Sequence, residues 1–196
     1  MNFLTSGWLS VYKPLNISSS KTVLKIKKKF KLNKIGHAGT LDPLATGVLP
    51  IAFGSTTKIV SYAMKQNKKY RFSIKWGEQT NTDDSEGNII FRSQKIPQKN
   101  EIKKQLLNFI GVIDQCPPKF SAIKINGKRA YNLSRKNEKF KITSRKVKVL
   151  SLKHIKDLNN CESLFEIYCS SGFYVRSFAR DFAILLGSRG HISYLE

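Results

Sequence analysis

One carboxylate in the first third of the chain is a candidate for catalysis. Asp42 lies in the segment KIGHAGTLDPLATGVLPIAFG, residues 34–54, whose other residues are mostly glycine, proline, small or apolar. An ionised carboxylate can act as a nucleophile or as a base, and burying it is costly unless it is paired. The Asp42-Pro43 step also favours a turn, so spacing alone makes a turn-capping role the first interpretation.

Arg176 is the natural partner for such a carboxylate. It follows Gly172, Phe173 and Tyr174 in a short apolar turn. A guanidinium beside Asp42 would hold the carboxylate in its ionised form. The alternatives for Arg176 are a structural ion pair or a contact with a phosphate group.

Three ring-bearing side chains could contact a nucleobase. Tyr70 and Tyr174 lie near the ends of predicted elements, where an aromatic face could stack on an extruded base. Periodicity alone favours core packing for both. His37, in a glycine-flanked loop, could stack on RNA or replace a displaced base, or it could simply be hydrogen-bonded in place. No phosphate-binding loop or dinucleotide fingerprint is present, so neither an NTP nor NAD is implied.

The charge balance indicates a polyanionic partner. The 196 residues include 35 Lys and Arg against 13 Asp and Glu, a net charge of +22 with a pI of about 10.1. A domain this basic usually meets a polyanion, although a general lysine bias gives the same composition. Charge alone does not separate RNA from DNA or from an anionic membrane surface.

Composition also excludes several classes. No apolar run reaches the roughly 18–20 residues of a membrane helix, and no signal peptide is recognisable, so a cytosolic location is expected. Cys116, Cys161 and Cys169 form no C-x-x-C pair, which argues against a zinc site and favours reduced thiols.

The elements that must position these residues follow from local patterns. Residues 18–20 are serines that can cap a basic helix, and a sharply turned loop carries Asp42 into a strand at 48–53. We predict further strands at residues 8–12, 69–76, 88–91, 147–155 and 162–168, and helices at 56–64, 101–109 and 178–186. A polar turn is predicted at 79–87. This organisation favours an α+β fold with a mostly antiparallel central sheet.

The segment 119–143 reads as a projecting basic insertion. Asn126-Gly127 is a hairpin-turn signal, and residues 130–135 can form a short helix. A plain solvated hairpin is the alternative interpretation.

The order of several motifs resembles the TruB family of tRNA pseudouridine synthases. GHAGTLDPLATGVLP, residues 36–50, is similar to that family's signature GHxGTLDPxAxGxLP. Lys13-Pro14 with the serine run, Lys69-Tyr70, TNTDDSEG, PPKFSAIKINGKRAY and CSSGFYVRS resemble its other motifs in the same order. The resemblance covers residues 7–195, nearly the whole chain.

The resemblance implies a role for each matched position. Asp42 would be the essential aspartate that attacks the sugar or deprotonates it, with Arg176 as its ion-pair partner. Tyr70 would stack on the flipped uracil and help to remove a proton, while Tyr174 and Lys13 would line the site. Residues implied to bind RNA are His37, Lys124, Lys128 and Arg129. The implied substrate is uridine 55 in the T-loop of tRNA, bound by a monomer without a metal or an organic cofactor.

The departures from the family pattern avoid the proposed chemistry. Tyr12 replaces a frequent Asp, Asn81 replaces the first Asp of the turn motif, and Phe173 replaces a usual Thr. The chain ends at HISYLE, where the family continues into a helix and a small RNA-binding PUA domain. We therefore expect one catalytic domain, residues 1–196, with an RNA-binding thumb at about 119–143 and no PUA domain. The alternative functions are a tRNA-binding or tRNA-folding module with little turnover, and a structural RNA-binding protein.

Overall fold

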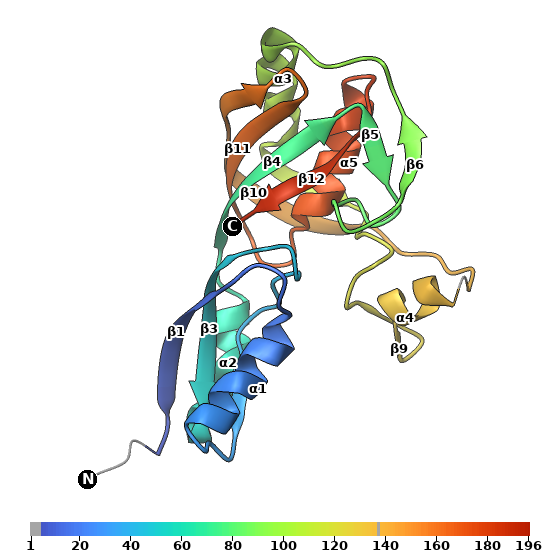
Figure 1. Ribbon diagram of the computed structural model, residues 1–196. Coiled ribbons are helices and arrows are strands. Elements are labelled where there is room, and N and C mark those ends of the chain that lie inside the picture. The colour runs from blue at the N-terminus through green and yellow to red at the C-terminus, as the bar shows by residue number, and fades with distance from the viewer. Residues whose placement is uncertain (1–4, 137) are drawn as a thin grey trace. The chain divides into compact units, whose positions relative to one another are not determined.

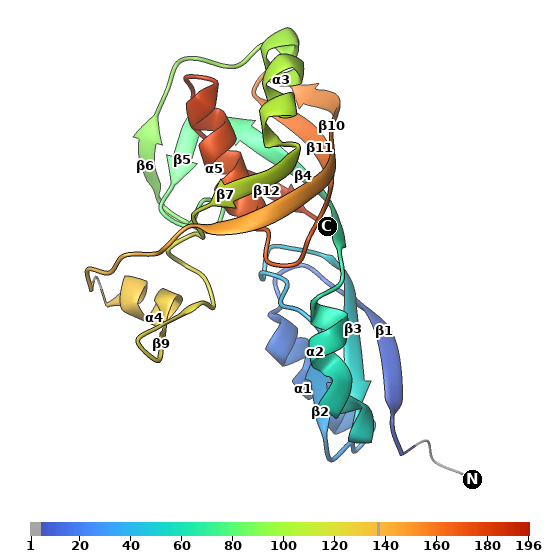
Figure 2. The same ribbon diagram turned by 180° about the vertical axis from the view of Figure 1, so that it is seen from behind.

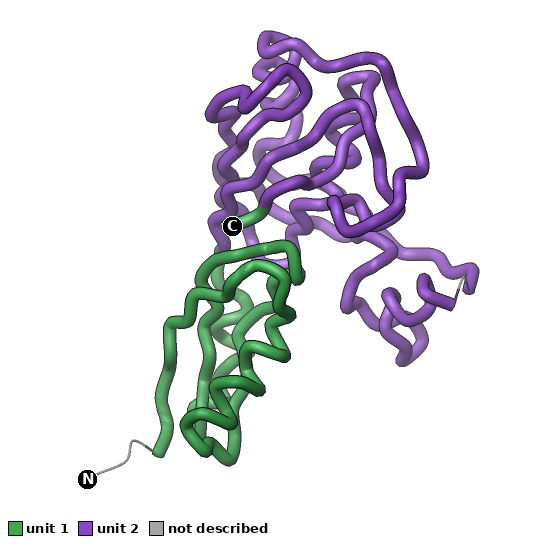
Figure 3. Tube along the Cα trace, viewed as in Figure 1, with its two compact units in different colours: residues 1–67, 195–196 green, residues 68–194 purple. Residues whose placement is uncertain are grey.

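The computed structural model describes residues 5–136 and 138–196, which form two compact units. Unit 1 comprises residues 1–67 with 195–196, and unit 2 comprises residues 68–194 (Figure 3). The expectation of a single catalytic domain stays a prediction. In the described residues, no helix is both long and apolar enough to cross a membrane.

Unit 1 is a three-stranded antiparallel sheet with one helix packed on it. The strand order is β1 (Gly7–Lys13), β3 (Gly47–Phe53), β2 (Ile35–His37). Helix α1 (Ser19–Lys29) covers one face of the sheet, where its Val23 packs with Leu49 and Ile51 of β3 (Figure 1). The predicted cap is confirmed, because the Ser18 hydroxyl accepts a hydrogen bond from the Lys21 backbone N–H at 3.2 Å.

Two predictions for unit 1 need correction. The helix predicted at 56–64 is instead a 3₁₀ helix, η1 (Gly54–Ile59), followed by a short α2 (Val60–Met64). The loop before β3 contains the short strand β2. We did not predict this strand, because the glycines of the loop interrupt any strand pattern in the sequence. The last two residues of the chain belong to unit 1, where Leu195 forms a parallel bridge with Ala45.

Unit 2 is built on a five-stranded sheet of order β12-β4-β11-β10-β7. These strands are β4 (Lys68–Trp76), β7 (Gly111–Gln115), β10 (Arg145–Asn159), β11 (Glu162–Cys169) and β12 (Gly190–Leu195). The pairs β4–β11, β11–β10 and β10–β7 are antiparallel, so the predicted α+β class with a mostly antiparallel sheet is confirmed. Strands β7 and β12 were not predicted.

Helices α3 (Lys99–Leu106) and α5 (Val175–Leu185) of unit 2 lie on one face of this sheet (Figures 1 and 2). Helix α3 is continued by the 3₁₀ turn η2 (Leu107–Phe109). Alternation along β4 directs Phe72 toward α5, where its ring lies 5.7 Å from that of Phe178. Phe165 of β11 and Phe182 of α5 complete this aromatic core.

Two hairpins extend from unit 2. Strands β5 (Glu78–Thr80) and β6 (Ile89–Arg92) pair with each other, so the turn predicted at 79–87 is wrong at its start. Strands β8 (Lys124–Ile125) and β9 (Lys128–Arg129) enclose the predicted Asn126-Gly127 turn, and α4 (Ala130–Arg135) follows at its predicted position. Figure 1 shows this second hairpin and α4 beside the five-stranded sheet rather than within it.

Candidate active site

Asp42 is half-buried in a loop whose backbone is held by the first turn of α1. The Ser19 hydroxyl accepts a hydrogen bond from the Leu41 N–H at 2.9 Å and donates one to the Leu41 carbonyl at 3.0 Å. Ser19 is 1% exposed, so water does not compete for these bonds. One hydroxyl thereby satisfies both backbone groups of the residue that precedes Asp42.

The residue after Asp42 is held by a buried ammonium. Lys13 is 0% exposed, and its Nζ donates to the carbonyls of Pro14 at 2.9 Å, Ile17 at 2.7 Å and Pro43 at 3.3 Å. The Asn16 N–H also donates to the Pro43 carbonyl, at 2.9 Å. A buried ammonium needs such acceptors, and here they couple the end of β1 to the Asp42 loop. Lys13 is therefore a positioning residue.

The turn-capping interpretation of Asp42 holds for its backbone. The Ala45 N–H donates to the Asp42 carbonyl at 3.0 Å, which closes the turn through Pro43 and Leu44. Because the main chain makes this bond, the carboxylate is not needed to close the turn. The loop thus fixes the backbone of Asp42 from both sides while its side chain remains partly exposed.

His37 stands at the end of β2 with a fixed ring. Its Nδ1 lies 2.5 Å from the Gly39 carbonyl, and the His37 backbone pairs with Ile51 of β3. Gly39 has a φ of +131°, a conformation that favours glycine, so the bend that brings its carbonyl to the ring depends on that residue. The half-buried ring is hydrogen-bonded in place, and a contact with RNA stays a prediction.

In unit 2, Arg176 is buried at the start of α5 and its guanidinium binds two carbonyls and a carboxylate. It donates to the Thr82 carbonyl at 3.0 Å and to the Phe120 carbonyl at 3.1 Å. Its Nη1 lies 3.4 Å from Oδ2 of Asp84, which is 2% exposed. Asp84 belongs to the TNTDDSEG turn, a motif that the sequence singled out without giving this residue a role.

Asp83, next to Asp84, forms an ion pair with Arg180, the next arginine along α5. Arg180 lies four residues after Arg176 and so on the same face of the helix, and its Nη1 is 2.9 Å from Oδ2 of Asp83. Burial raises the pKa of Asp83, while the charge of Arg180 opposes that shift. Two arginines on one helix face therefore hold two adjacent aspartates of one turn.

Tyr174 is clamped at the N-cap of α5. Its N–H donates to Oε1 of Gln115 at 2.7 Å, and its carbonyl accepts from Nε2 of Gln115 at 3.0 Å. The guanidinium of Arg145 lies 4.9 Å from the centre of the Tyr174 ring, within the range of a cation–π contact. Gln115 and Arg145 carry no sequence signal for this role, because both lie on strands distant along the chain.

Tyr70 continues the apolar face of β4. It shares that face with Phe72, Ile74 and Trp76, which are at most 2% exposed, whereas Tyr70 is half-buried. Its backbone pairs with Ile167 of β11. The ring thus lies where the core face reaches the surface, in keeping with both core packing and stacking.

The three basic residues predicted to bind RNA lie on the β8–β9 hairpin and are all exposed. Lys124 stands directly opposite Arg129, and Ile125 opposite Lys128. Like charges placed opposite each other destabilise a hairpin, so this pair favours an anionic partner.

The predicted site residues are divided between the units. Lys13, His37 and Asp42 belong to unit 1, where Lys13 and the Asp42 loop come together. Tyr70, Tyr174, Arg176 and the hairpin residues belong to unit 2. The pairing of Asp42 with Arg176 stays a prediction.

Comparison with known proteins decides the family. Residues 27–175 match the family described as "TruB family pseudouridylate synthase (N terminal domain)". The chain belongs to this family. It is 48% identical over 191 residues to tRNA pseudouridine synthase B of Ehrlichia chaffeensis and 50% identical over 191 residues to that of Bartonella henselae. Each alignment covers 97% of this chain, but only 64% and 60% of the relative.

A solved structure supports the same fold. In a crystal structure of a Cbf5-Nop10-Gar1 complex, one chain is similar with a TM-score of 0.72 and 26% identity. The similarity covers 96% of this chain and 47% of that one. The α+β pseudouridine synthase fold expected for a TruB family member is thereby confirmed.

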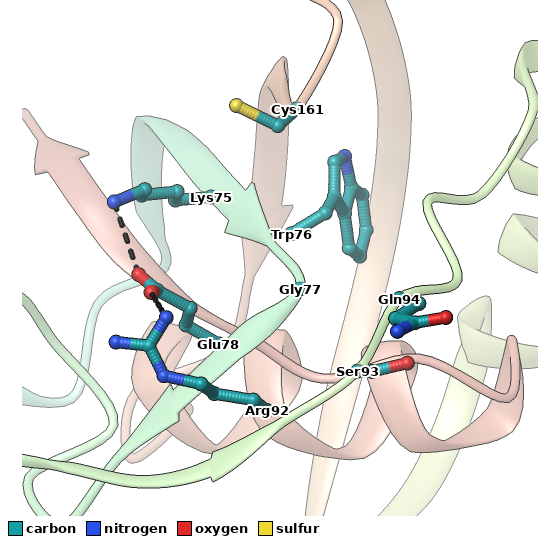
Figure 4. Close-up of a pocket in the computed structure, with 8 residues that line it drawn as sticks. All are labelled: Lys75, Trp76, Gly77, Glu78, Arg92, Ser93, Gln94 and Cys161. Atoms are coloured by element: carbon teal, nitrogen blue, oxygen red, sulfur yellow. Dashed lines mark ion pairs between the residues drawn. The ribbon is translucent and has the colours of Figure 1, made fainter.

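Outside these residues, unit 2 has a hollow of about 600 Å³ beside the β4–β5 corner. Glu78 lies between Lys75 and Arg92 there, with ion-pair distances of 3.1 and 3.0 Å (Figure 4). None of the residues assigned a role by the TruB family resemblance lines this hollow. Among the described residues, no group of three or more His, Cys, Asp or Glu side chains is arranged to hold a metal ion.

Proposed function

We propose that this chain isomerises a uridine of tRNA, the T-loop uridine at position 55, to pseudouridine. The relatives named tRNA pseudouridine synthase B support the reaction and the substrate class. The observation that carries the proposal is the Asp42 loop. Buried Ser19 and Lys13 hold the residues before and after Asp42, so that the backbone that carries its carboxylate is preorganised.

The chemistry needs one carboxylate and no external reactant. The Asp42 carboxylate attacks the ribose or removes a ribose proton, and the bond between C1′ and N1 of uracil breaks. The detached uracil rotates and its C5 bonds to C1′ while the Asp42–ribose bond breaks or, in the second route, the ribose proton returns from Asp42. The proton on C5 is then removed while N1 gains one. Base flipping is part of this proposal, because the ribose and uracil must leave the stacked loop to reach the carboxylate.

The remaining residues have supporting roles in this scheme. Arg176 pairs with Asp42 and keeps the carboxylate ionised. Tyr70 stacks on the uracil and assists the final proton removal, and Tyr174 lines the base site, held by Gln115. His37 contacts the displaced RNA.

RNA binding is assigned to the β8–β9 hairpin. The exposed, oppositely placed Lys124 and Arg129, together with Lys128, present cations that an RNA backbone neutralises. With a net charge of +22, affinity should fall steeply as salt rises. An affinity insensitive to salt would contradict this assignment.

Asp42→Asn is the direct test. The substitution keeps the shape of the side chain and removes its charge, so pseudouridine formation should be abolished while tRNA binding is largely retained. Pseudouridine mapping on tRNA treated with the 196-residue chain reads out both turnover and target position.

Asp114→Asn is the matched control. Asp114 is 63% exposed in its ion pair with Lys146, so the same chemical change there should leave turnover unaltered. Turnover by Asp42→Asn near the unmutated rate would refute the mechanism. Tight tRNA binding without any pseudouridine, even in the unmutated chain, would favour the tRNA-binding module. The cytoplasmic location and the monomeric state also stay predictions.

A further inference from the structure

The C-terminal end of α1 gathers lysines that no carboxylate neutralises. Lys27, Lys28 and Lys29 occupy its last turn, and Lys31 follows. No Asp or Glu occurs in residues 1–41, and in the described part of the chain no ion pair involves Lys27, Lys28 or Lys31. Attraction to the helix dipole explains part of the preference for lysine in the last turn, but not the Lys31 position beyond it.

Three of these lysines, Lys27, Lys28 and Lys31, line a shallow hollow of about 520 Å³ in unit 1. Its lining residues are Leu24, Lys27, Lys28, Lys31, Leu32 and Asn33. Two leucines therefore contribute apolar surface between three cations and an amide. Such a surface suits a sugar–phosphate backbone, whose phosphates meet ammonium groups while the ribose meets apolar carbon.

The backbone at Lys31 is unusual for a lysine. Its φ is +50°, and the Leu32 N–H donates to the Lys27 carbonyl at 3.0 Å, the bond of a helix end at which glycine is the favoured residue. The other non-glycine residues described with positive φ are Asn16, Asp83 and Asn126. Asparagine and aspartate tolerate this conformation, whereas lysine gains nothing from it locally. Lys31 thus places a positive charge at a backbone position where local folding prefers glycine.

The hollow lies away from the Asp42 loop. Ser19, at the first turn of α1, contacts Leu41, and the 11 residues of α1 span about 16 Å. The lysines at the other end of the helix are therefore too distant to touch the ribose that Asp42 would attack.

We propose that this hollow binds backbone phosphates of the tRNA at a second contact, away from the uridine that is isomerised. The inference rests on the proposed function for its substrate. The lysines and leucines that supply most of the lining suit phosphate and sugar rather than a particular base sequence. The contribution of the contact is affinity and orientation of the tRNA.

Lys31→Gly separates this role from a structural one. Glycine fits the positive φ, so the variant should unfold at the same or a higher denaturant concentration than the unmutated chain. Its Kd for full-length tRNA should rise roughly threefold to tenfold at about 100 mM salt, and the salt slope should fall by about one. Lys31→Gln should show the same loss of affinity while keeping a side chain at the strained position.

Lys65→Gln is the matched control, because Lys65 is exposed in unit 1 outside the hollow and the substitution removes the same charge. Equal Kd and salt slope for Lys31→Gly and the unmutated chain would overturn the phosphate site. An equal loss in Lys65→Gln would also overturn it, since only net charge would then matter. Turnover is scored separately: an unmutated chain that binds tRNA through Lys31 but forms no pseudouridine refutes the proposed function and leaves this site standing.

Discussion

Replacing Ser19 with alanine tests whether α1 positions the Asp42 loop. The Ser19 hydroxyl forms hydrogen bonds with both the N–H and the carbonyl of Leu41, at 2.9 and 3.0 Å, and Ser19 is 1% exposed. Alanine keeps the helix but leaves two backbone groups without that partner. Each such loss in a buried setting costs about 1–2 kcal/mol, so the free energy of unfolding should fall by about 2–4 kcal/mol.

The same substitution should slow turnover, because Leu41 immediately precedes Asp42. Displacement of a reacting group by about 1 Å can cost on the order of 100-fold in rate, so a loss of roughly tenfold to 100-fold is expected at saturating tRNA. Urea denaturation measures the first effect, and single-turnover pseudouridine formation measures the second. Their combination distinguishes a positioning role from a general loss of folded protein.

Ser20→Ala is the matched control on the same helix. Ser20 is exposed, so the change should leave stability within about 0.5 kcal/mol and turnover unaltered. If Ser19→Ala and Ser20→Ala had the same stability and rate, the claim that α1 fixes the Asp42 loop would be refuted. A loss of stability without slower turnover would show that the loop tolerates movement.

Three further outcomes follow from buried groups. Lys13→Met removes the donor to three carbonyls and should lower the free energy of unfolding by about 2–4 kcal/mol in urea denaturation; an unchanged midpoint would contradict the positioning role. Arg176→Lys keeps the charge but cannot reproduce the fork that reaches two carbonyls and Asp84, so we expect a loss of about 2–3 kcal/mol, and full stability would show that the fork is dispensable. Burial raises the pKa of the Cys169 thiol to about 12, so at pH 8 its reactive thiolate is scarce. Alkylation followed by mass spectrometry should label it after Cys116 and Cys161, and earlier labelling would mean that its surroundings open.

The sequence by itself determined the elements whose signals are local. Alternation along β4, the serine cap of α1, the Asn126-Gly127 turn and the helix at 130–135 were all predicted near their observed positions. Each depends on side chains a few residues apart, whose periodicity or capping is visible in a short window. The density of the motif around Asp42 likewise identified the family before any geometry was known.

Short elements with weak local signals were missed. Strand β2 has three residues, one of them glycine, and β12 begins at Gly190 after a glycine-containing turn. Such segments become strands because a neighbouring strand supplies hydrogen-bond partners, which no periodicity in their own residues records. The helix predicted at 56–64 divided into η1 and α2 for a related reason, since propensity does not distinguish a tight 3₁₀ turn from an α-helix.

The support of the candidate site was decided only by tertiary structure. Ser19 reaches Leu41 across 22 residues, Lys13 reaches Pro43 across 30, and Arg176 reaches Thr82 across 94. Sequence could nominate Asp42 and Arg176 from residue type and motif, but not the buried hydroxyl and ammonium that hold the loop. Those bonds form only where distant backbone groups are brought together and shielded from water, because burial makes an unsatisfied polar group costly and so selects its partner.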